Sequence, residues 1–172
     1  MNRVTQFCIW LSRLHKSRGF GIQSPTDYAF VRYVVDEHWP YYAYETLGTN
    51  DNWLQRKRGL LCFRLANWRQ AAVVIDRVGV SDYLKAGCRS ARITDNGNEV
   101  ELAILSIHDD LKTFVSRCSD TSVVMVSDIY QDRKRWKQIV ADKRITISYD
   151  LYYCGILLFD PKRTKQHYIV NF

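Results

Sequence analysis

Two residues in the second half of the chain could act together in acid–base chemistry. His108 follows one apolar run, and Asp128 follows another. A histidine or carboxylate side chain that reaches a substrate can transfer a proton near neutral pH. If both residues lie at the carboxyl ends of adjacent strands, they face one crevice, and we take them as candidate catalytic residues. The alternative is that His108 is a surface histidine in the first turn of a helix.

Basic and aromatic residues raise a second possibility, the binding of nucleic acid. The chain has 25 Lys and Arg against 18 Asp and Glu, a net charge of +7, together with five Trp and eleven Tyr. Aromatic rings stack on unpaired bases, and cations attract phosphates. The segment 39–44 (WPYYAY) combines aromatic residues beside basic ones. No RNA-binding motif is present, however, and aromatic side chains also fill protein cores.

The cysteines do not form a metal-binding or disulfide pattern. They number five, are widely scattered and never have CxxC spacing: Cys8, Cys62, Cys88, Cys118 and Cys154. We therefore expect small buried hydrophobic residues rather than a disulfide framework or a zinc site.

Length and composition are typical of a globular protein. The chain has 172 residues, of which 47% are hydrophobic and 25% charged, and we expect one domain over 1–172. No apolar run approaches the roughly 18 residues of a membrane span, and the N-terminus lacks the apolar core of a signal peptide. We expect a cytoplasmic location and no membrane partner.

The first 70 residues have the periodicity of helices and form an N-terminal helical extension. Apolar spacing predicts an amphipathic helix over about 3–16. Ser24-Pro25 is an N-cap followed by a proline, and it begins a second helix that ends near residue 38. A third helix is expected over about 53–68, interrupted or weakened at Gly59.

From residue 71 to 172, strands and helices alternate. We expect strands at 71–75, 91–94, 100–106 and 122–127, and helices at 79–86, 108–117 and 131–142. Further strands are expected at 145–149 and 152–159, and residues 167–170 are expected to close a hairpin. The order predicts an α/β fold, a Rossmann-like three-layer sandwich whose mostly parallel sheet has antiparallel C-terminal strands.

Several stretches match the motifs of one enzyme family. Residues 18–25 are RGFGIQSP and residues 40–45 are PYYAYE, similar to an HGIHSPF segment followed by PYY. Residues 123–129 (VVMVSDI) with Trp136 are similar to a strand ending in DDIHW, and KQHY at 165–168 is similar to a KQHF ending. Together they resemble bacterial class I S-adenosylmethionine-dependent methyltransferases of the O-methyltransferase type.

The resemblance implies a cofactor site after the first strand. That family has an acidic-x-Gly-x-Gly-x-Gly loop there, whereas this chain has IDRVGVSD at 75–82, with one glycine. By correspondence, Asp76, Gly79 and Asp82 would line the S-adenosylmethionine site. Asp95 would bind the ribose or else belongs to the turn DNGN. Only 89–99 stands where the family has two strands and their helices, so about one strand is missing.

The resemblance also implies that a metal site is possible. Some related O-methyltransferases hold a divalent cation with clustered carboxylates. Here the candidates are Asp109, Asp110 and Asp128 at neighbouring strand ends. We expect no metal, and we interpret Asp109 and Asp110 as the start of a helix, where a negative charge is favoured.

Three functions are compatible with these features. We favour a degenerate methyltransferase-like pseudoenzyme, a non-catalytic module that binds an unknown protein or small molecule. We expect no cofactor in it, because side chains in place of the glycines would occupy the cofactor's space, and S-adenosylmethionine would bind only if the protein is active. The alternatives are an active S-adenosylmethionine-dependent O-methyltransferase with an atypical cofactor site and a basic nucleic-acid-binding protein. A homo-oligomer is expected, because the shortened sheet edge must be covered or paired. The apolar faces of the N-terminal helices must likewise pack on the sheet or on a second subunit.

Overall fold

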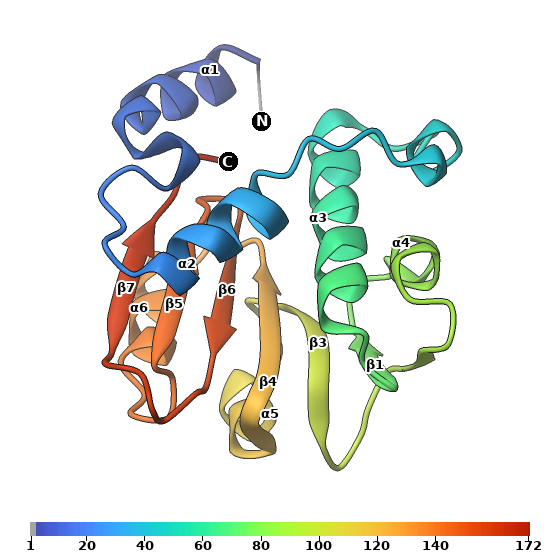
Figure 1. Ribbon diagram of the computed structural model, residues 1–172, viewed down its shortest axis with the longest axis vertical. Helices are drawn as coiled ribbons and strands as arrows, with labels where there is room; N and C mark the ends of the chain where they lie inside the picture. Colours follow the sequence, from blue (N-terminus) through green and yellow to red (C-terminus); the bar gives the residue numbers. More distant parts are fainter. Residues whose placement is uncertain (1–2) are drawn as a thin grey trace.

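The described part of the chain folds around a seven-stranded sheet with the order β2-β1-β3-β4-β6-β5-β7. The computed structural model describes residues 3–172 (Figure 1). The strands are β1 (Val73–Asp76), β2 (Arg92–Thr94), β3 (Val100–Ser106), β4 (Cys118–Ser127), β5 (Ile147–Asp150), β6 (Cys154–Leu158) and β7 (Gln166–Ile169). β2, β1, β3 and β4 run parallel, whereas β6 is antiparallel to both of its neighbours. The predicted α/β class with a mostly parallel sheet is confirmed.

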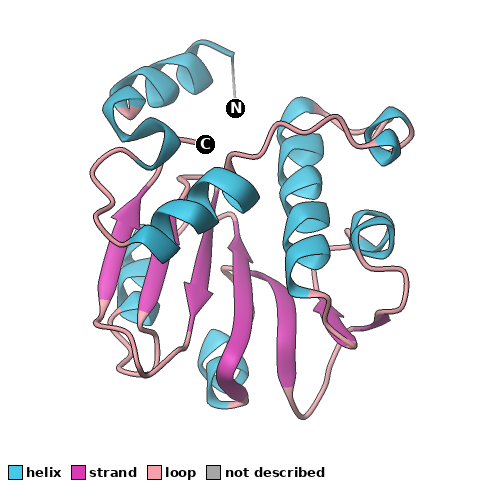
Figure 2. Ribbon diagram, viewed as in Figure 1, coloured by secondary structure: helices cyan, strands magenta, loops and turns pink. Residues whose placement is uncertain are grey.

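Helices cover both faces of the sheet and make three layers (Figure 2). One face carries α2 (Pro25–Phe30), η2 (Val31–Val35), α3 (Trp53–Arg69) and α4 (Ser81–Gly87). The other face carries α5 (Leu111–Ser116) and α6 (Arg133–Val140). The remaining elements are α1 (Arg3–Ser12), η1 (Leu14–Gly19) and η3 (Tyr42–Glu45). No helix within residues 3–172 is both long and apolar enough to cross a membrane.

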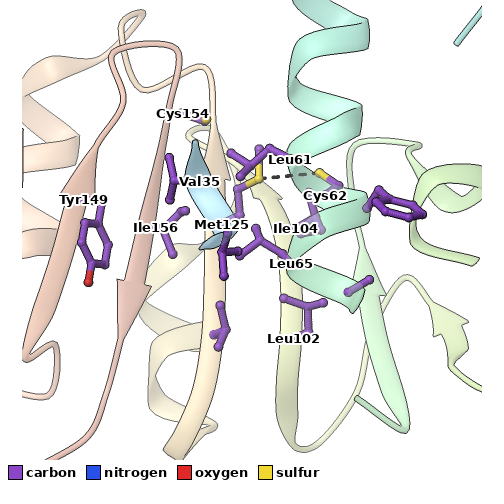
Figure 3. Close-up of a cluster of buried hydrophobic side chains, with 14 of the residues drawn as sticks. Val35, Leu61, Cys62, Leu65, Leu102, Ile104, Met125, Tyr149, Cys154 and Ile156 are labelled. Carbon is purple, nitrogen blue, oxygen red and sulfur yellow. Dashed lines mark hydrogen bonds between the residues drawn. The ribbon is translucent and has the colours of Figure 1, made fainter. Parts of the chain in front are cut away.

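The alternation of side chains along the central strands divides the core in two. Leu102 and Ile104 of β3 face α3, whereas Ala103 and Leu105 face α5 and α6, and all four are fully buried. Figure 3 shows the first cluster, where Cys62 of α3 contacts Met125 of β4 with 3.6 Å between their sulfur atoms. Burying a large apolar side chain contributes about 1.5–3 kcal/mol, so these two clusters hold the helices to the sheet.

Two details of the N-terminal half follow from local chemistry. Ser24 caps α2 as predicted, because its hydroxyl accepts a hydrogen bond from the Asp27 N–H at 3.3 Å. The predicted interruption of the third helix at Gly59 is wrong, since α3 is continuous from Trp53 to Arg69. The ring of Tyr83 packs directly on Gly59, and a larger side chain has no room there. Close packing therefore accounts for the glycine inside this helix.

The C-terminal strands differ from the predicted hairpin. β7 pairs with β5 in parallel, and Tyr149 lies beside Tyr168 in that ladder. The physical reason is that β6 is already paired with β4 on one edge and with β5 on the other. The outer edge of β5 is therefore the place where β7 can add. At the opposite edge, β2 has only three residues, and the homo-oligomer expected through that edge stays a prediction.

Candidate functional site

A pocket of about 430 Å³ opens at the carboxyl ends of β1 and β4. β2 and β3 lie on opposite sides of β1, and open α/β sheets bind ligands at such a reversal of strand order. The volume lies within the range of small-molecule sites. The walls come from the loop 46–51, from α3, from residues 78–83 after β1, and from the end of β4.

Asp76, the last residue of β1, organises the loop that borders the pocket. Its Oδ1 accepts hydrogen bonds from the N–H groups of Val78 and Gly79 at 3.0 and 2.9 Å. Its Oδ2 accepts from the Val80 N–H and the Ser81 hydroxyl, both at 2.8 Å. In phosphate-binding loops such N–H groups point at the ligand. Here they are bonded to Asp76 instead, so the loop does not present a phosphate cradle.

Gly79 occupies the left-handed region of backbone conformation, with φ +76°, where glycine is favoured. A β-carbon at this position would meet no atom within 4 Å, so the loop faces open space. Val78 and Val80 line the same pocket without filling it. Arg77 turns toward Asp109, with 3.4 Å between the guanidinium and the carboxylate.

Among the described residues that line the pocket, three are carboxylates and one is an arginine: Asp51, Asp82, Asp128 and Arg58. Arg58 pairs with Asp128, with 2.7 Å between Nη1 and Oδ1. The charges of Asp51 and Asp82 are then left without a cation in the wall. An acidic lining attracts a cationic ligand and repels a phosphate.

Asp128 has an unusual backbone conformation, with φ +62°. Its N–H donates to the Tyr153 carbonyl at 2.8 Å, and its own carbonyl accepts from the Gln131 N–H at 2.9 Å. These bonds turn the chain sharply at the end of β4 and bring the carboxylate to Arg58. Left-handed non-glycine residues are uncommon and concentrate at functional sites.

Tyr83 of α4 closes one side of the pocket and fits against two glycines. A β-carbon at Gly59 would lie 2.4 Å from its ring, and one at Gly48 would lie 1.8 Å from its hydroxyl oxygen. The hydroxyl donates to Asp51 at 2.7 Å. Burial, together with this bond to a carboxylate, raises the pKa of Tyr83 above its ordinary value, so the hydroxyl remains a donor.

The structure brings three of the five predicted site residues into the pocket wall: Gly79, Asp82 and Asp128. Asp76 lies behind the loop as its hydrogen-bond acceptor. His108 is not part of the lining; its side chain is exposed, and its Nε2 lies 3.0 Å from Oε1 of Gln131. The catalytic and cofactor-binding roles of these residues stay predictions.

The other acidic residues considered from the sequence lie outside the lining. Asp110 caps α5 by accepting from the Thr113 N–H at 3.4 Å, as expected for a residue that begins a helix. Asp109 accepts from the Ser106 N–H at 2.7 Å. Asp95 is exposed in the turn after β2. Within residues 3–172, no group of three or more His, Cys, Asp or Glu side chains could hold a metal ion.

Asp51, Arg58 and Tyr83 belong to the candidate site and were not identified from the sequence. The useful signal was Gly59, since a glycine inside a helix often marks a close approach by another group. Comparisons with protein-family models, curated proteins and solved structures gave no match. The shape, charge and hydrogen bonds of the pocket are therefore the basis for its function.

Proposed function

We propose that the protein is a non-catalytic, class I methyltransferase-like protein whose pocket binds S-adenosylmethionine or a related nucleoside without phosphate groups. The observation that carries the proposal is the direction of the loop amides at 78–80, which bond to Asp76 beside an acidic wall. A nucleotide phosphate would find no free loop amide and would meet the charges of Asp51 and Asp82. S-adenosylmethionine carries a sulfonium, an ammonium and a carboxylate group, and no phosphate; its net charge is positive, which suits this wall.

Two features of the sheet support the resemblance to methyltransferases. The antiparallel strand β6 lies between β4 and β5, which agrees with the antiparallel closing strands that the resemblance implies. The interval 89–99 contains only the three-residue strand β2, where that family has two strands. The sheet has therefore kept the strands that border the pocket, and the shortening falls on the edge beyond β1.

Two contacts support binding without methyl transfer. His108, the candidate general base, is bonded to Gln131 outside the pocket wall. Asp128, the candidate inside it, has one carboxylate oxygen in an ion pair with Arg58 at 2.7 Å, so that oxygen already has a partner within the protein. We therefore assign the pocket to ligand binding.

Isothermal titration calorimetry of the full chain tests this function. We expect S-adenosylmethionine to bind with a Kd below about 100 μM, near −5.5 kcal/mol. S-adenosylhomocysteine, which lacks the sulfonium charge, should bind more weakly, and NAD should give no heat. Flat titrations with both S-adenosyl compounds, or tighter binding of NAD, would refute the proposal.

A matched pair of variants tests the role of charge. Asp82→Asn removes one carboxylate from the wall. It should raise the Kd for S-adenosylmethionine by about fivefold and the Kd for S-adenosylhomocysteine by less. Glu99→Gln makes the same charge change at an exposed residue just before β3. This residue lies at the amino end of the strand, whereas the pocket lies at the carboxyl ends, so both affinities should stay unchanged. Equal effects of Asp82→Asn on the two ligands would remove the electrostatic argument.

A further inference from the structure

A groove with two lobes lies between α1 and the body of the protein. Figure 1 shows α1 beyond the end of the sheet, close to the C-terminus. The larger lobe, about 570 Å³, is bordered by residues 35–38, by α3 and by 171–172, and the smaller lobe has a volume of about 170 Å³. Trp10, Lys57 and Phe172 line both, so the two lobes adjoin. Part of the apolar face of α1 is therefore turned toward this groove.

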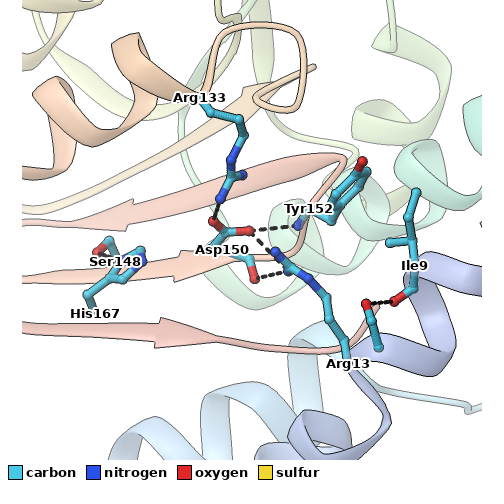
Figure 4. A network of polar contacts seen from close by, with 8 residues as sticks. Ile9, Arg13, Arg133, Ser148, Asp150, Tyr152 and His167 are labelled. Carbon is cyan, nitrogen blue, oxygen red and sulfur yellow. Dashed lines mark hydrogen bonds and ion pairs between the residues drawn. The ribbon is translucent and has the colours of Figure 1, made fainter.

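Polar contacts hold the segment after α1 beside the groove. Arg13 Nη1 lies 3.1 Å from both the carbonyl oxygen and Oδ1 of the buried Asp150 (Figure 4). The Asn171 N–H donates to the Lys16 carbonyl at 3.1 Å, and the Asn171 amide donates to the Ser17 hydroxyl at 3.1 Å. Hydrogen bonds and an ion pair therefore link this segment to β5 and to the end of the chain.

Helix α3 contributes one of its faces to the groove. Four side chains recur at intervals of three or four residues, which places them on one side of a helix, and all four line the groove: Trp53, Lys57, Leu60 and Arg64. Arg64 is 7% exposed, and its guanidinium donates to the carbonyl oxygens of Val34 and Val35 at 2.7 and 2.9 Å. The charge of Arg64 is thus held by backbone acceptors.

The ammonium group of Lys57 lies between two aromatic rings. Its Nζ is 5.0 Å from the centre of the Trp53 ring and 4.6 Å from the centre of the Phe172 ring. No carboxylate of residues 3–172 forms an ion pair with it. Burial lowers the pKa of Lys57, and the neighbouring charge of Arg64 acts in the same direction. An anion beside this ammonium would therefore be stabilising.

The acidic residues of the groove lie along the larger lobe and already have partners. Asp36 pairs with Arg32 at 3.8 Å and with His38 at 3.2 Å. Glu37 accepts a hydrogen bond from the Tyr41 hydroxyl at 2.7 Å. Neither carboxylate lines the smaller lobe.

The smaller lobe combines one cation with aromatic walls. Lys57 is the only charged side chain among the described residues that line it. Five of the others are aromatic: Phe7, Trp10, Trp53, Tyr153 and Phe172. A cavity of roughly 150 Å³ holds benzene, so a lobe of about 170 Å³ accommodates one aromatic ring. Contacts between aromatic rings contribute beyond the burial of their area.

We propose that the smaller lobe binds a carboxylate ligand that carries one aromatic ring, as in an arylacetate. The ring lies among the aromatic side chains, and the carboxylate pairs with the ammonium of Lys57. This carboxylate supplies the counter-ion that the lysine lacks, and a hydrogen bond between two charged groups is stronger than one between neutral groups. The lobe is separate from the pocket at the ends of β1 and β4, and the proposal does not depend on the ligand there.

An NMR titration of the full, ¹⁵N-labelled chain with phenylacetate tests the proposal. The indole N–H signals of Trp10 and Trp53 should shift, whereas that of Trp136, buried under α6 on the other face of the sheet, should not. We expect a Kd of about 1 mM, because a ligand of this size has few atoms to contribute. Phenylacetamide has the same shape without the charge and should bind at least about fivefold more weakly. Equal Kd values for the two compounds, or no shift of either indole signal, would overturn the proposal.

Matched variants isolate the charge of Lys57. Lys57→Met removes the ammonium and should raise the Kd for phenylacetate by about tenfold, while the Kd for phenylacetamide changes by less than about twofold. Lys134→Met makes the same change at an exposed residue of α6 and should leave both Kd values unchanged. Equal losses for the two ligands in Lys57→Met would overturn the proposal.

A second variant covers the case in which Lys57→Met lowers the Tm. Lys57→Arg keeps the positive charge and should bind phenylacetate within about threefold of the wild-type Kd. A loss in Lys57→Arg as large as that in Lys57→Met would show that the charge does not select the ligand, and the proposal would fail.

Discussion

Tyr149 of β5 donates a hydrogen bond to Asp27 of α2 at 2.6 Å, although 122 residues separate them in the chain. The Tyr168 hydroxyl donates to the other carboxylate oxygen at 3.0 Å, and Arg163 pairs with the first. Asp27 is 1% exposed, so this network ties α2 to the C-terminal strands inside the protein. A buried carboxylate is tolerated there because both of its oxygens are bonded.

The Asp27 network predicts an acid-sensitive fold. Burial acts to raise the pKa of Asp27, but hydrogen bonds from Tyr149, Arg163 and Ser24 outweigh it and hold the pKa below the ordinary value of 3.8. A carboxyl whose pKa is lower in the folded state stabilises the fold above its unfolded pKa, and this contribution is lost as the pH falls through its folded pKa. Urea unfolding should show the Asp27 contribution in full above about pH 5 and its loss below about pH 4.

The variant Asp27→Asn isolates this contribution. It leaves the Arg163 guanidinium without its charge partner and should lower the free energy of unfolding by about 2–4 kcal/mol at neutral pH. The difference from wild type should shrink below about pH 4, where the wild-type carboxyl is protonated. Asp95→Asn, at an exposed turn, is the control and should change stability by less than about 0.5 kcal/mol. A difference that does not change with pH would contradict the assignment.

Gly59→Ala tests the contact that forms one wall of the pocket. Alanine normally stabilises a helix interior by about 1 kcal/mol relative to glycine. Here we expect a destabilisation of about 2 kcal/mol, because the new β-carbon would lie 2.4 Å from the Tyr83 ring and force it outward. Thermal unfolding measures the sign directly. In a Tyr83→Ala background the same change should lose its penalty, and additive effects of the two changes would contradict the contact.

Most of the sheet could be predicted because its strands are short apolar runs bounded by clear turns. β3 occupies 100–106 as predicted, since the DNGN turn precedes it and its alternating faces are both buried. The predicted hairpin at 167–170 failed because pairing depends on which strand edges are free, and periodicity does not report that. The partner of the apolar face of α1 stayed open for a similar reason, because apolar spacing shows a face but not what covers it.

The candidate site could be predicted in part for a geometric reason. Gly79, Asp82 and Asp128 follow strands whose carboxyl ends meet at one edge, so the sequence order was enough to place them together. Asp51 and Arg58 come from the loop before α3 and from that helix, which precede every strand in the chain. No local spacing indicates that these residues return to the sheet, and only tertiary packing brings them there.

Two substitutions at Asp128 separate its charge from its backbone conformation. Asp128→Asn should lower the free energy of unfolding by less than about 1 kcal/mol, because the ion pair with Arg58 is partly exposed and asparagine tolerates the left-handed region. Asp128→Val should lower the free energy of unfolding by about 1–2 kcal/mol more, because a β-branched residue is strained at φ +62°. Urea unfolding compares the two, and equal losses would show that the conformation is not a constraint.

Asp76→Asn should loosen the loop that borders the pocket. The carboxylate accepts four hydrogen bonds, two at each oxygen, and the amide replaces one oxygen with a donor. At least one loop N–H then loses its acceptor, and we expect a loss of stability of about 1–3 kcal/mol. Hydrogen–deuterium exchange at the amides of 78–80 should accelerate, because their protection depends on this one side chain.

The control for this loop is Ser81→Ala, which removes the hydroxyl donor to Asp76 and spares the three amides. Exchange at 78–80 should stay slow in that variant and become fast in Asp76→Asn. A freed amide would also offer the pocket a donor that it now lacks. Asp76→Asn should therefore bind S-adenosylmethionine more weakly, through loss of the ordered wall, while its rejection of NAD is relaxed. Unchanged exchange in Asp76→Asn would mean that the loop is held by other contacts and that its amides do not determine which ligand the pocket accepts.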